Sequence, residues 1–304
     1  SLAAEQLGIK SEEVLVCSTG LIGVELPMAL IRTGVGKIQI TENGGNALAR
    51  AMLTTDQRTK EIAITCQGTE SQFTIGGISK GSGMIHPNMA TMLAFLSTDA
   101  NVEAEFLRSC LKEVVEETFN MITIDGDTST NDSVILLANG QSAGEQIKHD
   151  SAHASLFREG LRVVCTYLAK EIIRDAEGAS KLMEITVNGA RTMEDARKAA
   201  RTVAGSTLVK TAVHGGDPNW GRVAAALGYS GAEVQEEKLA FYINDVCIME
   251  DGRPIPFHKE AIIAIMSGSE VKFRIDLNIG DNQAIAWGCN LSEAYVTFNS
   301  AYTT

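Results

Sequence analysis

The chain has 304 residues, 44% of them hydrophobic, and a formal net charge of −12. This length and apolar content are typical of a globular protein with one large domain or two moderate ones. The negative charge argues against a nucleic-acid partner, because phosphate binding requires clustered Lys and Arg. No apolar run approaches the roughly 20 residues that a membrane-spanning helix needs, so we expect a soluble protein.

Six cysteines are scattered along the chain, without any Cys-x-x-Cys pair and each in or beside an apolar segment. This pattern favours reduced core residues of a cytoplasmic protein over a disulfide framework or a zinc site. No signal or transit segment is apparent. Because the chain begins with Ser1 rather than Met, we interpret its start as a cut end. The cysteines are Cys17, Cys66, Cys110, Cys165, Cys247 and Cys289.

An apolar segment near the start, Val14–Cys17, is predicted to be a strand that ends in Ser18-Thr19-Gly20. A strand that runs into a hydroxyl and a glycine can present a side-chain donor and a backbone N–H at one point. An ordinary strand-to-helix turn is the alternative. The patterns that follow predict helical segments over 27–31 and 46–53 and two paired strands over 61–66 and 72–78.

The stretch Lys80–Leu93 places Thr91 directly after a constrained turn. Two glycines and a proline shape the backbone before Thr91, and the continuous apolar run over 92–96 predicts a central strand. A hydroxyl is thereby delivered from a turn onto a buried strand, so Thr91 is a candidate nucleophile. The alternative is a plain loop that enters a strand.

The acidic run Asp125–Asp132 lies between a predicted helix over 101–121 and a predicted strand over 134–138. A calcium loop of the EF-hand type requires Gly at its sixth position and Glu at its twelfth, whereas Thr130 and Leu136 stand there. We therefore predict a polar turn that shapes a site rather than a metal site.

Two later segments contain polar residues that can belong either to a site or to a turn. A predicted helix over 151–174 is followed by Asp175–Ala179, which as a sequence is typical of a solvated helix cap. The segment Lys210–Arg222 is rich in turn formers and is predicted to be a loop. Its His214 is a candidate general base, with a structural hydrogen-bonding role as the more usual alternative.

The remaining elements follow from shorter patterns, and the change to short alternating pieces near 229–237 indicates a smaller C-terminal α/β layer. The polar tail over 297–304 would normally fray. The predicted strands cover 182–187, 238–248, 271–277 and 283–289, and the predicted helices cover 192–204, with a Thr192 cap pattern, and 259–266.

The sequence lacks a phosphate loop, a complete Gly-x-Gly-x-x-Gly, a Gly-x-Ser-x-Gly elbow and a His-Glu-x-x-His motif. Covalent catalysis by a Thr requires none of these motifs, so it stays open. An internal Thr has only an amide nitrogen, which cannot take the hydroxyl proton. Once the preceding peptide bond is cut, the freed α-amino group, with a reference pKa of about 7.7–8.0, can serve as the base. If the Ala90–Thr91 peptide is strained, Thr91 can attack the Ala90 carbonyl and form an ester that water releases.

The Lys80–Leu93 stretch resembles the self-cleavage signature of the ornithine acetyltransferase (glutamate N-acetyltransferase) family. Six further blocks are similar to that family and follow its order across nearly the whole chain. Family chains generally extend further at the N-terminus, so the resemblance implies that an N-terminal region is missing. The seven blocks are Ser18–Gly20, Met52–Asp56, Lys80–Leu93, Asp125–Asp132, Asp175–Ala179, Lys210–Arg222 and Asn299–Thr304.

The resemblance implies a layered α/β fold of the α+β type, similar to DmpA and ornithine acetyltransferase, in which a central strand starts at the Thr nucleophile. We expect an α-fragment over 1–90, ahead of the cleavage site. The nucleophile-bearing part of the β-fragment is expected over 91–230, and a smaller C-terminal α/β domain over 231–304.

The resemblance also assigns roles to individual residues. Thr91 would be the nucleophile, cleavage would fall between Ala90 and Thr91, and the Thr19 hydroxyl and Gly20 N–H would form the oxyanion hole. Lys80 suits a substrate carboxylate, and Glu177 suits the side-chain ammonium of ornithine. The implied substrate-binding residues are Thr54, Lys80, Thr91, Glu177, Asn299 and Thr304.

The activity implied by the resemblance is ping-pong acetyl transfer from N2-acetylornithine to glutamate in arginine biosynthesis, without a metal or cofactor. Some family members also accept acetyl-CoA as a donor, and the sequence leaves this open. The α- and β-fragments would associate as an α2β2 heterotetramer. Two alternatives remain: an N-terminal-nucleophile amidase or aminopeptidase that passes the acyl group to water, and a non-catalytic binding or scaffold protein that keeps the fold.

Overall fold

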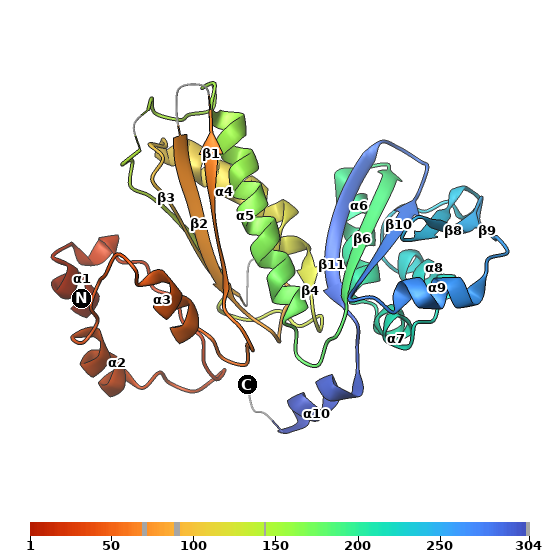
Figure 1. Ribbon diagram of the computed structural model, residues 1–304, viewed down its shortest axis with the longest axis horizontal. Helices are drawn as coiled ribbons and strands as arrows, with labels where there is room; N and C mark the ends of the chain where they lie inside the picture. The colour runs from red at the N-terminus through yellow and green to blue at the C-terminus, as the bar shows by residue number, and fades with distance from the viewer. Residues whose placement is uncertain (69–71, 88–91, 143, 302–304) are drawn as a thin grey trace.

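The computed structural model describes residues 1–68, 72–87, 92–142 and 144–301. The predicted nucleophile Thr91, its neighbour Ala90 and the tail residue Thr304 lie outside these ranges. The described elements form two β-sheets with helices between and around them (Figure 1). The layered α/β fold predicted from the sequence is therefore confirmed.

The first sheet has the strand order β1-β2-β3-β5. β3 is an inner strand, antiparallel to β2 and parallel to β5, which confirms the central position predicted from its continuous apolar run. The predicted strand pair over 61–66 and 72–78 is the antiparallel β1–β2 pair. The strands are β1 (Lys60–Gln67), β2 (Gln72–Lys80), β3 (Leu93–Thr98) and β5 (Ser133–Ala138).

The second sheet has the strand order β4-β11-β6-β10-β7-β8-β9. β6 pairs in parallel with β10 and antiparallel with β11, so strands from both sides of the expected boundary at residue 230 share one sheet. The divisions at 90 and 230 stay predictions. The strands are β4 (Ile122–Thr123), β6 (Leu182–Ala190), β7 (Ala240–Ile243), β8 (Val246–Glu250), β9 (Arg253–Pro254), β10 (Glu270–Asp276) and β11 (Asn282–Cys289).

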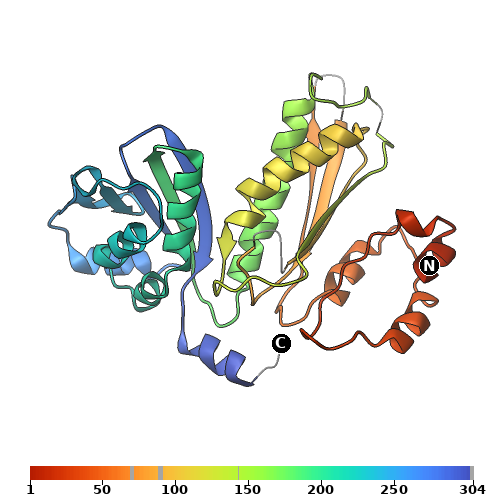
Figure 2. The same cartoon turned by 180° about the vertical axis from the view of Figure 1, so that it is seen from behind.

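The long helix α5 (Ala154–Arg174) lies between the two sheets and is shared by both cores (Figures 1 and 2). It packs against β1 and β2 on one side and contacts β4, β6 and β11 on the other. α4 (Ala104–Glu117) packs on α5, and α6 (Met193–Gly205) covers β6 and β11. The Thr192 hydroxyl accepts a hydrogen bond from the Asp195 amide, as its cap pattern predicted.

Three secondary-structure predictions were wrong. Residues 14–17 are not a strand, because their apolar side chains find no sheet partner among the described residues. The predicted loop 210–222 is mostly two helices, α7 (Thr207–Gly215) and α8 (Trp220–Gly228), whose first turns are capped by Ser206 and Asn219. The predicted single strand 238–248 is the β7–β8 hairpin, which turns at Asn244 with a φ of 50°.

Residues 1–51 lie beyond the first sheet, on the side away from the second sheet (Figures 1 and 2). Many of their apolar side chains are exposed, including Val16 at 86% and Ile40 at 78%, so this part contributes little to the core. It contains α1 (Leu2–Leu7), η1 (Ser11–Glu13), α2 (Met28–Val35) and α3 (Gly45–Ala51); η2 (Phe119–Met121), η3 (Glu236–Lys238), α9 (Lys259–Met266) and α10 (Glu293–Ala301) complete the described helices.

All six cysteines are free thiols. Four of them are buried, as the sequence predicted, whereas Cys17 and Cys247 are only partly buried. In the described part of the chain, no helix has both the length and the apolar character needed to cross a membrane.

The close approach of α5 to the first sheet requires Gly160. A Cβ at this position would lie 2.5 Å from Cys66 Sγ and 3.2 Å from Ile75 Cδ1. We expect Gly160→Ala to lower the free energy of unfolding in urea by about 1–3 kcal/mol through overpacking. Gly215→Ala is the matched control, because its Cβ would meet nothing within 4 Å.

A double-mutant cycle tests the physical cause of this loss. Removing the sulfur with Cys66→Ala should make the second change, Gly160→Ala, less costly than it is in the unmodified chain. Strict additivity of the two changes would show that the sulfur contact is not the source of the destabilisation.

Candidate active site

A cavity of about 630 Å³ lies at the end of the first sheet, where several distant segments meet. Its walls come from the irregular segment 18–26, the turn after α3, the end of β2, the acidic run 125–131, the turn after α5, and α10. Six of the predicted site residues line it: Thr19, Gly20, Thr54, Lys80, Glu177 and Asn299. Thr91 and Thr304 cannot be placed, because they lie outside the described ranges.

The start of β3 belongs to the cavity wall through Leu93. Leu93 pairs with Lys80 of β2 on one side and with Ser133 of β5 on the other. Backbone pairing thus holds the residue two places after Thr91 beside Lys80. The sheet register therefore brings the two ends of the Lys80–Leu93 stretch side by side.

Lys80 places an ammonium group in a largely desolvated position at the cavity. Its side chain is buried, and it makes no hydrogen bond or ion pair with another described residue. Burial lowers the pKa of Lys80, while Asp56, Asp132 and Glu177 oppose this effect by favouring the charged form. An ammonium group at a cavity wall that bonds to no other described side chain is suited to bind a carboxylate of a ligand.

Glu177 is buried and faces the cavity, contrary to the solvated cap that is typical of its sequence setting. Its Oε1 accepts a hydrogen bond from Thr55 Oγ1 at 2.7 Å, and its Oε2 accepts one from Asn299 Nδ2 at 3.0 Å. The Glu177 amide donates to the Ser82 carbonyl at 2.8 Å. A Cβ on Gly83 would lie 2.5 Å from Oε2, so only glycine leaves room for this carboxylate.

Thr19 and Gly20 lie on the cavity wall within an irregular segment rather than at the end of a strand. Both are exposed, so the predicted oxyanion pair is open to the cavity and to solvent. Their role stays a prediction, because the nucleophile that they would serve is outside the described residues.

Asp125 shapes the turn that follows Lys80 in the chain. Its carboxylate accepts hydrogen bonds from the amides of Met84 at 2.6 Å and Ile85 at 2.9 Å. These bonds hold Met84 in the left-handed region, with a φ of 52°. The acidic run therefore acts as the polar, site-shaping turn that the sequence predicted.

His214 does not line the cavity. Its Nδ1 lies 3.0 Å from Asn290 Nδ2, and its Nε2 lies 3.5 Å from Glu293. This arrangement favours the structural role over the general base.

Sequence reasoning missed two residues of this site, Thr55 and Tyr295. Thr55 bridges Ser82 Oγ at 2.6 Å and Glu177, and Tyr295 lines the cavity with its hydroxyl 3.5 Å from Asp125 Oδ2. Thr55 lies inside the Met52–Asp56 block, whose resemblance to the family indicated that the segment belongs to the site but did not assign a role to Thr55. Tyr295 lies on α10, outside every block, and carried no signal.

Asp132, next to the start of β5, has two buried carboxylate oxygens with no hydrogen-bond partner among the described residues. Burial raises the pKa of Asp132 to about 8, and Lys80 opposes the shift. In the unfolded chain the pKa is about 3.9, so the folded state binds more protons between these values and stability falls as the pH rises through this window.

Asp132→Asn should therefore stabilise the protein at high pH. We expect a gain of about 1–3 kcal/mol in unfolding free energy above pH 8, because the neutral amide avoids the cost of a buried, ionised carboxylate. Near pH 4 the buried carboxyl is protonated, so we expect little gain. Urea unfolding at the two pH values checks this. Exposed Asp150→Asn is the control, and an equal gain at both pH values for Asp132→Asn would contradict the prediction.

Comparison with known proteins places the chain in one family. The model of the ArgJ family matches residues 1–304. The arginine biosynthesis bifunctional protein ArgJ of Symbiobacterium thermophilum is 49% identical over 100% of this chain and 76% of its own length. The protein of the same name from Dehalococcoides mccartyi is 46% identical over 99% of this chain and 74% of its own.

A solved structure supports the same assignment. The crystal structure of the arginine biosynthesis bifunctional protein ArgJ from Bacillus halodurans is 41% identical, with a TM-score of 0.69. The match covers 70% of this chain and 100% of that one. The family model, the relatives and the solved structure agree, and the protein belongs to the ArgJ family.

Proposed function

We propose that this ArgJ-family enzyme moves an acetyl group from N2-acetylornithine to glutamate through an acetyl ester on Thr91. The observation that supports this best is the convergence of Lys80, Glu177 and Asn299 with Thr19 on one cavity beside the start of β3. These groups come from distant parts of the chain. Together they offer an ammonium, a carboxylate, an amide and a hydroxyl, which an acetylated amino acid can use.

The substrate is oriented by its charges in this proposal. Its α-carboxylate pairs with the Lys80 ammonium, and the side-chain ammonium of ornithine pairs with Glu177. Glu177 is already held by Thr55 and Asn299, so its position is fixed before the substrate arrives. Thr54 and Asn299 add polar contacts that orient the substrate.

Acetyl transfer then proceeds in two balanced steps. The α-amino group of Thr91, freed by cleavage after Ala90, takes the hydroxyl proton while Thr91 oxygen attacks the acetyl carbonyl. The C–N bond breaks, ornithine leaves with the proton on its amine, and the acetyl group remains as an ester. The glutamate amine attacks this ester, the C–O bond to Thr91 breaks, and the amine proton passes through the Thr91 α-amino group to the Thr91 oxygen, which restores the hydroxyl. Thr19 and the Gly20 N–H stabilise the oxyanion in both steps.

No metal or cofactor takes part in the proposed reaction. Acetyl-CoA is an alternative acetyl donor, and the site residues do not distinguish between the two donors. The two fragments, 1–90 and 91–304, stay associated in the proposal, because β2 of the first pairs with β3 of the second, and both β1 and β2 pack on α5. Two copies of each fragment would form an α2β2 heterotetramer in the cytoplasm.

An N-terminal-nucleophile amidase shares all chemistry up to the acyl-enzyme. The fate of the acetyl group separates the two functions. Acetyl transferred to added glutamate supports the transferase, whereas free acetate formed in the presence of glutamate supports the amidase.

Mass analysis under denaturing conditions tests self-cleavage. We expect two fragments, Ser1–Ala90 and Thr91–Thr304, from a chain that is synthesised intact. Thr91→Ala should remain a single chain, because it lacks the attacking hydroxyl. A wild-type chain that folds but stays uncut would refute the self-cleavage step.

Kinetics of Thr19 variants test the oxyanion hole. Thr19→Val should lower kcat by about 10²–10³, because one of two oxyanion donors is lost in the transition state. Thr19→Ser, which keeps the hydroxyl, is the control and should stay within about 10-fold of the wild type. Full activity of Thr19→Val would remove Thr19 from the mechanism.

A further inference from the structure

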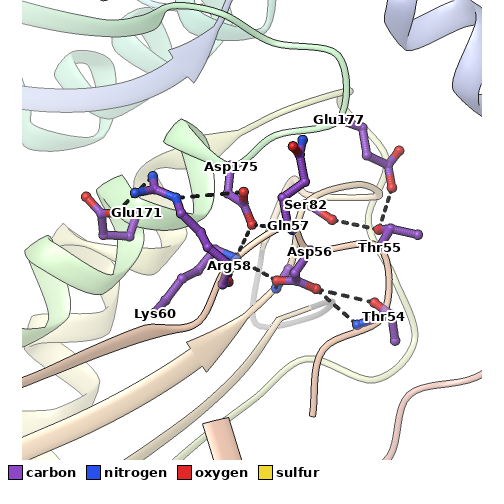
Figure 3. Close-up of polar contacts among 11 residues, drawn as sticks. Thr54, Thr55, Asp56, Gln57, Arg58, Lys60, Ser82, Glu171, Asp175 and Glu177 are labelled. Carbon is purple, nitrogen blue, oxygen red and sulfur yellow. Dashed lines mark hydrogen bonds and ion pairs between the residues drawn. The ribbon is translucent and has the colours of Figure 1, made fainter. Parts of the chain in front are cut away.

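A fully buried lysine, Lys60, lies at the start of β1, where it contacts Asp56 and Asp175 (Figure 3). Its Nζ is 2.7 Å from Asp56 Oδ1 and 2.6 Å from Asp175 Oδ2, and it also donates to the Arg58 carbonyl at 3.3 Å. The side chains of Lys60, Asp56 and Asp175 are 0%, 0% and 3% exposed. None of the three lines the cavity.

Asp56 connects this ion pair to two substrate-binding segments. Its Oδ1 accepts a hydrogen bond from the Gly81 amide at 2.6 Å, directly after Lys80. Its Oδ2 accepts hydrogen bonds from the Thr54 amide at 3.2 Å and from the Thr54 hydroxyl at 3.5 Å. One carboxylate thus holds the backbone next to both Thr54 and Lys80.

The charge of Asp56 is secured by its neighbours. Burial raises the pKa of Asp56, but the Lys60 ammonium and the Gly81 amide outweigh burial and leave the pKa below its usual value. The carboxylate is therefore ionised and can accept all of these bonds. Asp56 in turn favours the charged form of Lys80.

Asp175 connects the same lysine to the turn that carries Glu177. It follows the last residue of α5, and its Oδ2 also accepts a hydrogen bond from the Gln57 amide at 3.1 Å. From the outside, half-exposed Arg58 reaches Asp175 at 3.8 Å and Glu171 at 3.0 Å. Lys60 is thus the point where the segment 54–58, the end of β2 and the end of α5 are joined.

A role in stability alone does not account for this arrangement. Each buried ion loses several kcal/mol of hydration, so a buried ion pair is often no more stabilising than apolar residues of similar volume. The charges instead fix positions. Both carboxylate oxygens of Asp56 accept hydrogen bonds from groups next to the cavity, Oδ1 from Gly81 and Oδ2 from Thr54.

We propose that Asp56 and Lys60 are positioning residues for the acetyl donor, holding Thr54 and Lys80 at the spacing that the substrate requires. The inference rests on the proposed function, because it takes Thr54 and Lys80 as substrate-binding residues. Neither Asp56 nor Lys60 touches the substrate.

Asp56→Asn is the direct test. The amide has one acceptor oxygen, so it cannot serve both Gly81 and Thr54, and we expect KM for N2-acetylornithine to rise about 10-fold or more. The fall in kcat should be smaller. A change that only destabilised the protein would reduce the amount of active enzyme and leave KM unchanged.

Arg58→Ala is the matched control. It removes a charge that contacts Asp175 but leaves the Lys60 contacts with Asp56 intact, so KM should stay within about 2-fold of the wild type. An unchanged KM in Asp56→Asn, or an equal rise in Arg58→Ala, would overturn the inference. If Asp56→Asn does not fold, Lys60→Gln replaces it, because it removes the cation that holds the Asp56 carboxylate in place. Its KM should rise in the same direction.

Amide hydrogen exchange, followed without any substrate, separates this inference from the proposed function. The Gly81 and Thr54 amides should exchange faster in Asp56→Asn than in the wild type, and should not change in Arg58→Ala. If these amides exchange faster in Asp56→Asn but the wild type transfers no acetyl group, the proposed function is refuted and the positioning role of Asp56 is supported. Unchanged exchange would refute the positioning even in an active transferase.

Discussion

The antiparallel pairing of β2 with β3 is the constraint on which the rest of this structure depends. Six consecutive pairs, from Ile75↔Thr98 to Lys80↔Leu93, fix the end of β2 against the start of β3. In the proposed cleavage the covalent link between these strands is lost, while the pairing remains. In that proposal, Lys80 and the strand that follows the proposed nucleophile Thr91 keep their relative position without a connecting loop.

Small residues allow this sheet and α5 to approach closely. A Cβ at Gly77 of β2 would lie 2.5 Å from Leu96 and 2.9 Å from Leu168 of α5. Because α5 also packs on the second sheet, its C-terminal end is held from both sides. Asp175 and Glu177 follow that end, so packing in the core determines where two carboxylates of the site region lie.

The charges around the cavity favour a dipolar ligand. Lys80 is the only Lys or Arg among the described residues that line it, and it is accompanied by Asp125, Asp127 and Glu177. N2-Acetylornithine, the donor proposed above, can present its α-carboxylate to this cation and its side-chain ammonium to the acidic side. A simple anion would meet one favourable charge and several unfavourable ones.

The acidic residues behind the cavity have a different task from those that line it. Asp56 and Asp175 are occupied by Lys60 and by backbone amides, so they set backbone positions and do not compete for the substrate. Glu177 is held by neutral donors, Thr55 and Asn299, and accepts no hydrogen bond from a Lys or Arg among the described residues. In our proposal, a carboxylate that is paired with a buried cation positions the backbone, whereas a carboxylate that is held by neutral donors binds the ligand.

The sequence by itself determined the family, the layered fold and the segments that form the site, because these depend on local patterns and on motifs in a fixed order. It predicted β3 as a central strand from five apolar residues and the cap of α6 from Thr192, both of which are local properties. Its errors at 14–17 and 210–222 also have a physical reason. Apolar or turn-forming residues do not decide between strand, helix and loop until partners are available.

Only the tertiary structure decided which residues meet. The bonds of Thr55 to Glu177 and of Lys60 to Asp175 join positions more than a hundred residues apart, with separations of 122 and 115. No periodicity or spacing records such contacts, because they arise from the sheet register and from the packing of α5 between two sheets. For the same reason Glu177 read as a solvated cap in the sequence, and it is a buried carboxylate in the fold.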